Sequence, residues 1–279
     1  MGPALARLLR ERGETIAAVA SRTPERAAAA AKFVGGETKA VSYGELPQHA
    51  AHILIAVPDG AIGDVARVLA DAGMRSGVAL HTCGARGPEA LAPLAAAGVA
   101  CGAWHPLQTV ANPEEGARVL PGVAFAIDGE GEAAAWAEHL TAGLDGLALH
   151  IPPTKRPLYH AAAVMASNYL IALLSTAVML MREAGVEEAT ARRALAPLAR
   201  ASIENASRMG PAAALTGPIA RGDSDTVREH LVALANAAPE AVGLYCAAGL
   251  ATLQIARQQG LGKSSVSAIG ELLRERTTA

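Results

Sequence analysis

Histidine is the side chain best suited to proton transfer near neutral pH, and two histidines in this chain lie in informative surroundings. His105 belongs to the run WHPLQT (104–109), directly after an apolar segment. An imidazole at the end of a strand can protonate or orient a substrate carbonyl. The structural alternative is a histidine hydrogen-bonded to the backbone. We favour a catalytic His105, with Gln108 as a substrate-binding neighbour.

His160 begins a long uncharged stretch that also carries Ser167 and Asn168. In a helix His160 and Ser167 share a face, and Asn168 lies next to it. A single histidine on an apolar helix is usually a core residue with a satisfied hydrogen bond, but this cluster favours the lining of a site. We therefore predict that His160 and Asn168 are catalytic and that Ser167 binds substrate.

A loop with two glycines and a proline, LTGPIARGD (215–223), interrupts the helices near the end of the chain. Arg221 could bind a carboxylate or phosphate of a substrate, with Asp223 beside it. A salt bridge within the loop is the alternative. His49 and His52 are three residues apart, but no third ligand is visible, and we predict no metal site.

Short apolar segments alternate with helical patterns over the first half of the chain, which indicates parallel strands joined by βαβ crossovers. The segment HILIAV (52–57) is the clearest strand, and its continuous apolar character is typical of a strand covered on both faces. We expect strands at 15–20, 40–42, 52–57, 78–82, 99–104, 122–127 and 146–151, and helices at 4–12, 23–33, 61–72, 88–97 and 132–142.

After Pro152 and Pro153 the pattern becomes entirely helical, with helices expected at 158–184, 187–208, 224–236, 239–259 and 264–276. The sequence thus predicts an α/β domain over 1–152, with a doubly wound and mostly parallel sheet, and an all-α domain over 153–279. Residues 161–181 are long and apolar enough to span a bilayer. Their serine, threonine and asparagine residues favour a helix buried in a domain core or a dimer interface, and we expect no membrane partner.

The N-terminus resembles the middle of a dinucleotide-binding unit, which runs strand, G-x-G-x-x-G, helix. Gly2 and Pro3 precede a helical run as the third glycine of that motif would. The alternative is an ordinary glycine at the start of a helix. We expect the first strand and two glycines to lie upstream of Met1. Without that strand, 15–20 and 52–57 lack a shared neighbour and face a gap.

The residues expected to bind the cofactor follow the predicted strands. Ser21, Arg22 and Thr23 lie where such folds read the adenosine ribose, and a guanidinium with hydroxyls suits a 2′-phosphate, hence NADP(H). Val57, Pro58 and Asp59, and further along Thr82 and Gly84, end strands at the edge where ligands bind in open α/β sheets. Plain strand-to-helix turns are the alternative for both segments.

The formal net charge of −2 argues against a nucleic-acid partner. The three cysteines form no metal or disulfide pattern, and no signal peptide precedes the first helix, so we expect a cytoplasmic protein.

Three separated segments together carry a resemblance: HPLQT (105–109), YHAAAVMASNYL (159–170) and LTGPIARGD (215–223). They resemble bacterial Rossmann-like proteins with a C-terminal helical domain of unknown function. The wider relatives are pyrroline-5-carboxylate reductases, prephenate dehydrogenases, deazaflavin-dependent NADP reductases and 6-phosphogluconate-dehydrogenase-like enzymes. The resemblance implies hydride transfer with NADP(H), a site in the cleft between domains, and a homodimer built on the C-terminal helices. It implies no particular substrate.

The sequence therefore predicts an NADP(H)-dependent oxidoreductase acting on a small polar metabolite. The alternative is a non-catalytic dimer that binds a nucleotide or metabolite, because no lysine or glutamate stands out as an acid or base.

Overall fold

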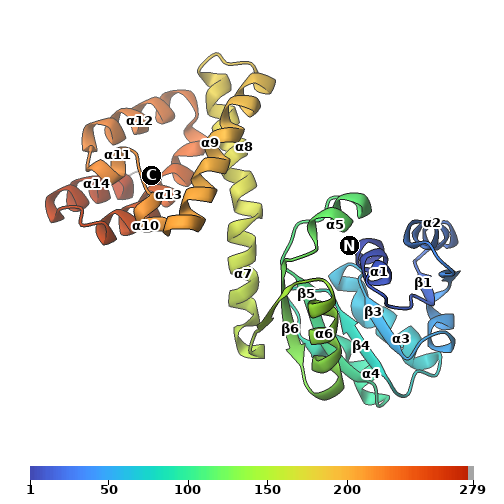
Figure 1. Ribbon diagram of the computed structural model, residues 1–279. Coiled ribbons are helices and arrows are strands. Elements are labelled where there is room, and N and C mark those ends of the chain that lie inside the picture. Colours follow the sequence, from blue (N-terminus) through green and yellow to red (C-terminus); the bar gives the residue numbers. More distant parts are fainter. Residues whose placement is uncertain (276–279) are drawn as a thin grey trace. The chain divides into compact units, whose positions relative to one another are not determined.

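The computed structural model describes residues 1–275 and divides into two units, Met1–Ser167 and Asn168–Ala279 (Figure 1). The sequence placed the domain boundary at 152/153. Helix α7 (Arg156–Ala166), expected in the helical domain, belongs to the first unit. The physical reason is Arg156, which is 2% exposed and bonded to residues of the sheet.

The first unit has the predicted alternation of strands and helices, which confirms the α/β fold class. A seven-residue helix, α5, was not expected. The elements are α1 (Gly2–Glu11), β1 (Ala18–Ala20), α2 (Pro24–Val34), β2 (Lys39–Val41), β3 (His52–Ile55), α3 (Ile62–Asp71), β4 (Val78–His81), α4 (Ala92–Ala96), β5 (Ala100–Pro106), α5 (Pro113–Val119), β6 (Ala124–Gly129), α6 (Gly131–Gly143) and β7 (Leu147–His150), with short 3-10 turns at Tyr43–Gln48, Asp59–Ala61, Pro88–Leu91 and Pro153–Lys155.

The strands form a two-stranded sheet, β1-β2, and a five-stranded sheet, β3-β4-β5-β6-β7. Every pairing is parallel except β5 with β6, where Pro106 lies opposite Phe125 and the chain reverses direction. One antiparallel pair agrees with the predicted, mostly parallel sheet, although the alternating pattern does not say where that pair lies. Helix α5 packs against α1, so the segment between β5 and β6 does not form a crossover that would return the chain for a parallel strand.

Two apolar clusters form the core of the first unit. One joins α1 and α6 to the sheet through Leu5, Leu140 and the fully buried Trp104, whose indole N–H donates to the Thr141 hydroxyl at 2.8 Å. The other joins α3 and α4 to the sheet through Ile62 and Leu94. All four residues of β4 are buried, as expected for a parallel strand covered on both faces.

The expected gap is present in the first unit. Within residues 1–275, β1 pairs with β2 and β3 pairs with β4, and neither pairs with the other. The proposal that a strand and two glycines lie upstream of Met1 stays a prediction.

The second unit is helical, as predicted. Its elements are α8 (Asn168–Glu183), α9 (Glu188–Met209), α10 (Pro211–Ala214), α11 (Pro218–Arg221), α12 (Ser224–Ala237), α13 (Pro239–Gln258) and α14 (Lys263–Glu275). Its core joins α11, α12, α13 and α14 through side chains that include Ile219, Val227, Leu253 and Ile269.

The long apolar helix differs from its prediction. It breaks at Ser167 into α7 and α8, and no side chain of α8 is buried, so burial in the core of a domain is wrong for this helix. Residues Pro153–Glu183 are long and apolar enough to cross a membrane by length and composition alone. Burial in a dimer interface stays a prediction.

Candidate functional site

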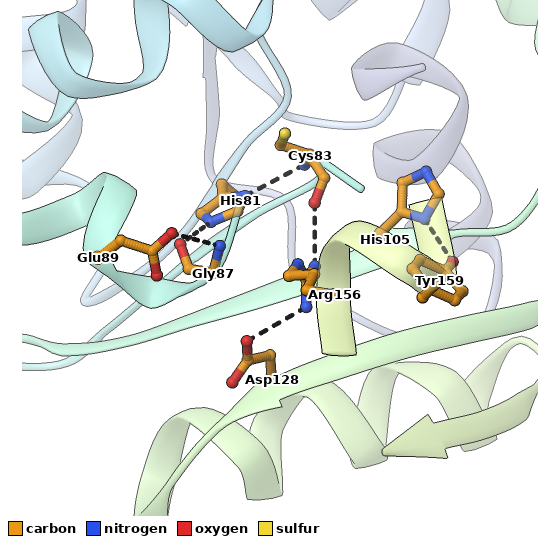
Figure 2. A network of polar contacts seen from close by, with 8 residues as sticks. All are labelled: His81, Cys83, Gly87, Glu89, His105, Asp128, Arg156 and Tyr159. Carbon is orange, nitrogen blue, oxygen red and sulfur yellow. Dashed lines mark hydrogen bonds and ion pairs between the residues drawn. The ribbon is translucent and has the colours of Figure 1, made fainter. Parts of the chain in front are cut away.

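His105 lies near the carboxyl end of β5 and pairs with the first turns of α7. Its Nδ1 lies 2.7 Å from the Tyr159 hydroxyl, and the two rings meet edge to face with centroids 5.8 Å apart (Figure 2). A Cβ on Gly84 would come within 2.9 Å of the His105 ring, so glycine is the residue that fits there. The structure thus brings together Gly84 and His105, which the sequence analysis placed at the ends of two different strands.

The surroundings of His105 keep its imidazole neutral. Burial, together with the nearby charges of Arg156 and His160, lowers the pKa of His105 to about 4. A neutral imidazole carries one ring proton and can donate or accept a hydrogen bond. At pH 7 it lacks the second ring proton, which is the one that a histidine transfers as an acid. Of the two roles expected for His105, a neutral imidazole suits orienting a substrate better than protonating it.

Tyr159 supplies the hydrogen bond that orients this ring. Burial raises the pKa of its hydroxyl, so the phenol stays protonated and is available as a donor. A hydroxyl that donates to Nδ1 of His105 leaves the single ring proton on Nε2. The Nε2 end of the ring points away from Tyr159 in Figure 2.

Arg156 is the functional candidate that sequence reasoning missed. It begins α7 with its guanidinium buried, where Nη1 lies 3.4 Å from Asp128 Oδ2 and Nη2 donates to the Cys83 carbonyl at 3.0 Å. Its Nε has no hydrogen-bond partner within the described residues. The run PPTKRP (152–157) is typical of an exposed basic turn, so the sequence gives no sign of a buried arginine. Only the fold shows that Arg156 joins β6 to the loop after β4.

His81, one strand away from His105, has a structural role. Its Nδ1 accepts from the Cys83 N–H at 3.1 Å, and its Nε2 lies 2.8 Å from the Gly87 carbonyl. These two partners are satisfied by one neutral tautomer, with the proton on Nε2. Burial lowers the pKa of His81, consistent with that neutral form.

Figure 2 shows His81, Arg156 and His105 as parts of one polar region between the ends of the strands. The loop after β3 reaches the same region, because the Cys83 thiol hydrogen-bonds the Asp59 side chain; burial and this bond raise the pKa of the thiol. Val57 and Pro58 lead directly into Asp59, and the Thr82 N–H donates to the Ile55 carbonyl at 3.1 Å. The predicted cofactor residues of β3 and β4 thus share one edge of the sheet.

The residues expected to hold the nucleotide lie around the start of α1. A Cβ on Gly2 would lie 3.1 Å from the Ala56 Cβ, so helix and strand approach closely at this glycine. No side chain caps the first turn of α1, which leaves its backbone N–H groups able to bind a phosphate. Gly2, Pro3 and Ser21 line one cavity of about 840 Å³. Arg22 is exposed, and Thr23 caps α2 by accepting from the Arg26 N–H at 3.4 Å.

Other predicted site residues have local partners. The exposed Gln108 accepts from the Thr109 N–H at 2.8 Å, and the Ser167 hydroxyl donates to the Ala163 carbonyl at 2.7 Å. Three predicted residues belong to the second unit: Asn168, Arg221 and Asp223. Asp223 caps α12 through the N–H and hydroxyl of Thr226, and these bonds lower its pKa.

Comparison with known proteins agrees with the two-part organisation. Residues 1–106 match a Rossmann-like domain, and residues 123–252 match a domain of unknown function, DUF2520. No curated protein sequence matches this chain.

Several solved structures have the same fold. Protein TM1727 from Thermotoga maritima is 21% identical, with a TM-score of 0.66 over 99% of this chain and 95% of that one. BF3122 from Bacteroides fragilis, described as a candidate NADP oxidoreductase, is 20% identical, with a TM-score of 0.66 over 92% and 93%. The pyrroline carboxylate reductase of Plasmodium falciparum, solved with NADP bound, is 12% identical, with a TM-score of 0.54 over 100% and 94%. The chain is therefore distantly similar in structure to NAD(P)-dependent reductases.

Proposed function

Starting from a chain that carries a Rossmann-like domain followed by a DUF2520 domain, we propose an NADP(H)-dependent oxidoreductase that acts on a small polar metabolite. The observation that carries the proposal is the neutral His105, held by Tyr159 against Gly84 at the edge where ligands bind in open α/β sheets.

The proposed cofactor site runs along that edge. The uncapped start of α1 at Gly2 and Pro3 would bind the pyrophosphate. Arg22, with Ser21 and Thr23, would bind the 2′-phosphate, which distinguishes NADP(H) from NAD(H). The backbone at Val57–Asp59 and at Thr82 and Gly84 would border the nicotinamide half, because a small or absent side chain allows close approach.

The bound cofactor would supply the hydride, and the protein residues would orient and polarise the substrate. His105 would donate from Nε2 to the substrate carbonyl or imine, since Tyr159 occupies Nδ1. A neutral donor polarises the acceptor without transferring its own proton. The proton would then come from His160. This residue follows Tyr159 on α7 and lies near enough to His105 to contribute to the lowering of its pKa.

The second unit supports a homodimer as part of this proposal. Large apolar side chains on α8 and α9 are exposed, among them Ile171 at 65% and Leu198 at 64%. Burying such a surface against a second copy favours association. Light scattering after size-exclusion chromatography tests this, and a monomer at micromolar concentration would contradict it. The three cysteines, which follow no disulfide pattern in the sequence, favour a reducing, cytoplasmic compartment.

A fluorescence titration with NADPH and NADH tests the cofactor. We expect tighter binding of NADPH than of NADH. Arg22→Asp should remove that preference, while Arg67→Asp, at an exposed arginine of α3, should keep it. The titration includes a second chain extended before Gly2 by an apolar strand and Gly-x-Gly. No binding by either chain at millimolar cofactor would contradict the proposal.

A screen of carbonyl and imine substrates, followed by NADPH absorbance, tests the chemistry. If both histidines are catalytic, turnover should fall by at least about a hundredfold in His105→Ala and in His160→Ala. Cofactor binding with no turnover across the screen would favour the alternative, a non-catalytic protein that binds the nucleotide.

A further inference from the structure

The loop after β4 binds most of its own backbone N–H groups, and the exception is Gly84. The Cys83 N–H donates to Nδ1 of His81 at 3.1 Å, and the Gly87 N–H donates to the Glu89 carboxylate at 2.8 Å. The two N–H groups that follow Gly84 hydrogen-bond the Cys83 sulfur. The loop is therefore held in one conformation on both sides of Gly84.

Gly84 itself is buried, and its N–H has no hydrogen-bond acceptor within residues 1–275. A buried N–H without an acceptor is costly, because it has lost its hydrogen bonds to water. Such a group in a native protein calls for an explanation, and a bound ligand or an ordered water molecule is a common one. The Gly84 N–H therefore marks a position for the oxygen atom of a bound molecule.

Arg156 fixes the direction of this N–H. Its Nη2 donates at 3.0 Å to the Cys83 carbonyl, which belongs to the same peptide group as the Gly84 N–H (Figure 2). No peptide bond within residues 1–275 is cis, and in a trans peptide the C=O and N–H point in opposite directions. The guanidinium is 2% exposed and also bonds Asp128, so it cannot turn freely. The Gly84 N–H is thus held pointing away from Arg156.

A second donor, the imidazole of His105, lies beside this peptide group. A Cβ on Gly84 would lie 2.9 Å from both Nε2 and Cε1 of His105. Since N and Cβ of one residue are about 2.5 Å apart, the Gly84 nitrogen lies within about 5.4 Å of Nε2. Two donors that each lie about 2.9 Å from a shared oxygen are at most about 5.8 Å apart. The distance therefore allows one oxygen atom to accept from both.

Arg156 stands behind this second donor as well. It begins α7, and Tyr159 follows one turn later on the same helix. The Tyr159 hydroxyl occupies Nδ1 of His105 and leaves the ring proton on Nε2. One buried cation thus holds the two segments that position the Gly84 N–H and the His105 ring.

We propose that the Gly84 N–H and Nε2–H of His105 bind one carbonyl oxygen of the substrate, and that Arg156 is the positioning residue for both donors. This inference rests on the proposed function and narrows its substrate to an aldehyde or ketone. A carbonyl oxygen has two lone pairs and accepts from two donors, whereas an imine nitrogen has one. When hydride from the cofactor adds to the carbonyl carbon, the C=O electron pair moves to the oxygen, where both donors stabilise the charge until a proton arrives.

NMR on a chain labelled with carbonyl-¹³C cysteine and ¹⁵N glycine observes this peptide group directly. Cysteine precedes glycine only at 83–84 and at 101–102, so a spectrum that selects bonded ¹³C–¹⁵N pairs holds two amide signals. Gly102 lies inside β5 and pairs with both neighbouring strands, which makes it the internal control.

The probes are NADP⁺, pyruvate, cyclopentanone and 1-pyrroline, each alone and each small molecule also with NADP⁺. With either ketone beside NADP⁺, we expect the Gly84 amide proton to move downfield and its exchange with solvent to slow about five- to tenfold. Gly102 should not respond. The imine 1-pyrroline, matched in ring size to cyclopentanone, should leave Gly84 unchanged.

A pair of arginine variants tests the positioning role. Arg156→Met should shift the Cys83 carbonyl and the Gly84 amide together and weaken the response to the ketones about tenfold or more. Adding Asp128→Asn removes the carboxylate left unpaired and keeps the test valid if the single variant folds poorly. Arg75→Met is the control, because Arg75 donates to the Met74 carbonyl at 3.1 Å, outside this loop. It should leave both signals and their responses as in the parent.

A Gly84 amide that responds to no probe, or that responds equally in the Arg156 variants, would overturn the proposal. A full response to NADP⁺ alone would assign the oxygen to the nicotinamide carboxamide and overturn the substrate assignment, as would an equal response to 1-pyrroline. NADPH oxidation with an unresponsive Gly84 would contradict this inference alone. A ketone response at Gly84 with no turnover would support the donor pair and contradict the oxidoreductase.

Discussion

The molecule contains two histidine–tyrosine pairs of nearly the same geometry, one in each unit. His105 and Tyr159 lie 2.7 Å apart with rings at 85°, and His230 and Tyr245 lie 2.9 Å apart with rings at 84°. Their surroundings differ, because His230 is exposed on α12 whereas His105 is partly buried near the cation Arg156. A pair of residues therefore does not define a site; burial and neighbouring charge do.

The largest expected effect comes from removing the cation that distinguishes the buried pair. Arg156→Met leaves Asp128 buried without its partner and should cost about 3–5 kcal/mol of unfolding free energy. Arg12→Met breaks the exposed pair with Asp145 and should cost about 0–1 kcal/mol. Urea denaturation measures both.

Two further measurements sharpen the Arg156 result. NMR titration should show the pKa of His105 rising in Arg156→Met, because a repelling charge is gone. Adding Asp128→Asn should recover part of the lost stability, since it removes the unpaired carboxylate. Equal losses in the Arg156 and Arg12 variants would contradict this account.

The next effect is a pH dependence of stability to which the buried His105 contributes, in the same direction as His81, whose pKa burial also lowers. An unfolded histidine takes up its proton near pH 6.5, whereas folded His105 does so near pH 4. Between these values the unfolded state binds more protons, so stability falls as the pH falls, by about 3 kcal/mol in total.

Urea denaturation at several pH values measures this slope. His105→Gln should reduce the slope and leave the share of His81, and His230→Gln serves as the control for the exposed pair. The interpretation fails if the two variants keep the same slope as the parent.

The smallest effect concerns the tyrosine hydroxyls. Tyr159→Phe leaves Nδ1 of the partly buried His105 without its partner and should cost about 1 kcal/mol. Tyr245→Phe should cost less than half as much, because water can replace the hydroxyl at the exposed His230. Thermal unfolding resolves this difference, and a larger loss in Tyr245→Phe would reverse the comparison.

Much of the fold could be predicted because its signals are local. The apolar run at 52–57 and the glycines and prolines that end helices mark strand and helix positions to within a few residues. The antiparallel pairing of β5 and β6 could not be predicted in this way, because it depends on where α5 packs. Of the two environments expected for α8, the structure contradicts the domain core, since apolar character alone does not say what covers a helix.

The site was predictable only in part for the same reason. Residues that end strands, such as Gly84 and His105, could be placed on a common edge from the parallel-sheet rule. Arg156, Asp128 and His81 carry no local signal, and they meet only after β4, β6 and α7 have come together.

The sequence by itself determined which segments are strands and helices, that a gap opens between β1 and β3, and which histidine stands at the sheet edge, because apolar periodicity and chain order encode these features. The tertiary structure alone decided the protonation state of that histidine and the buried arginine beside it. Charge, burial and hydrogen-bond partners act through space, between residues far apart in the chain.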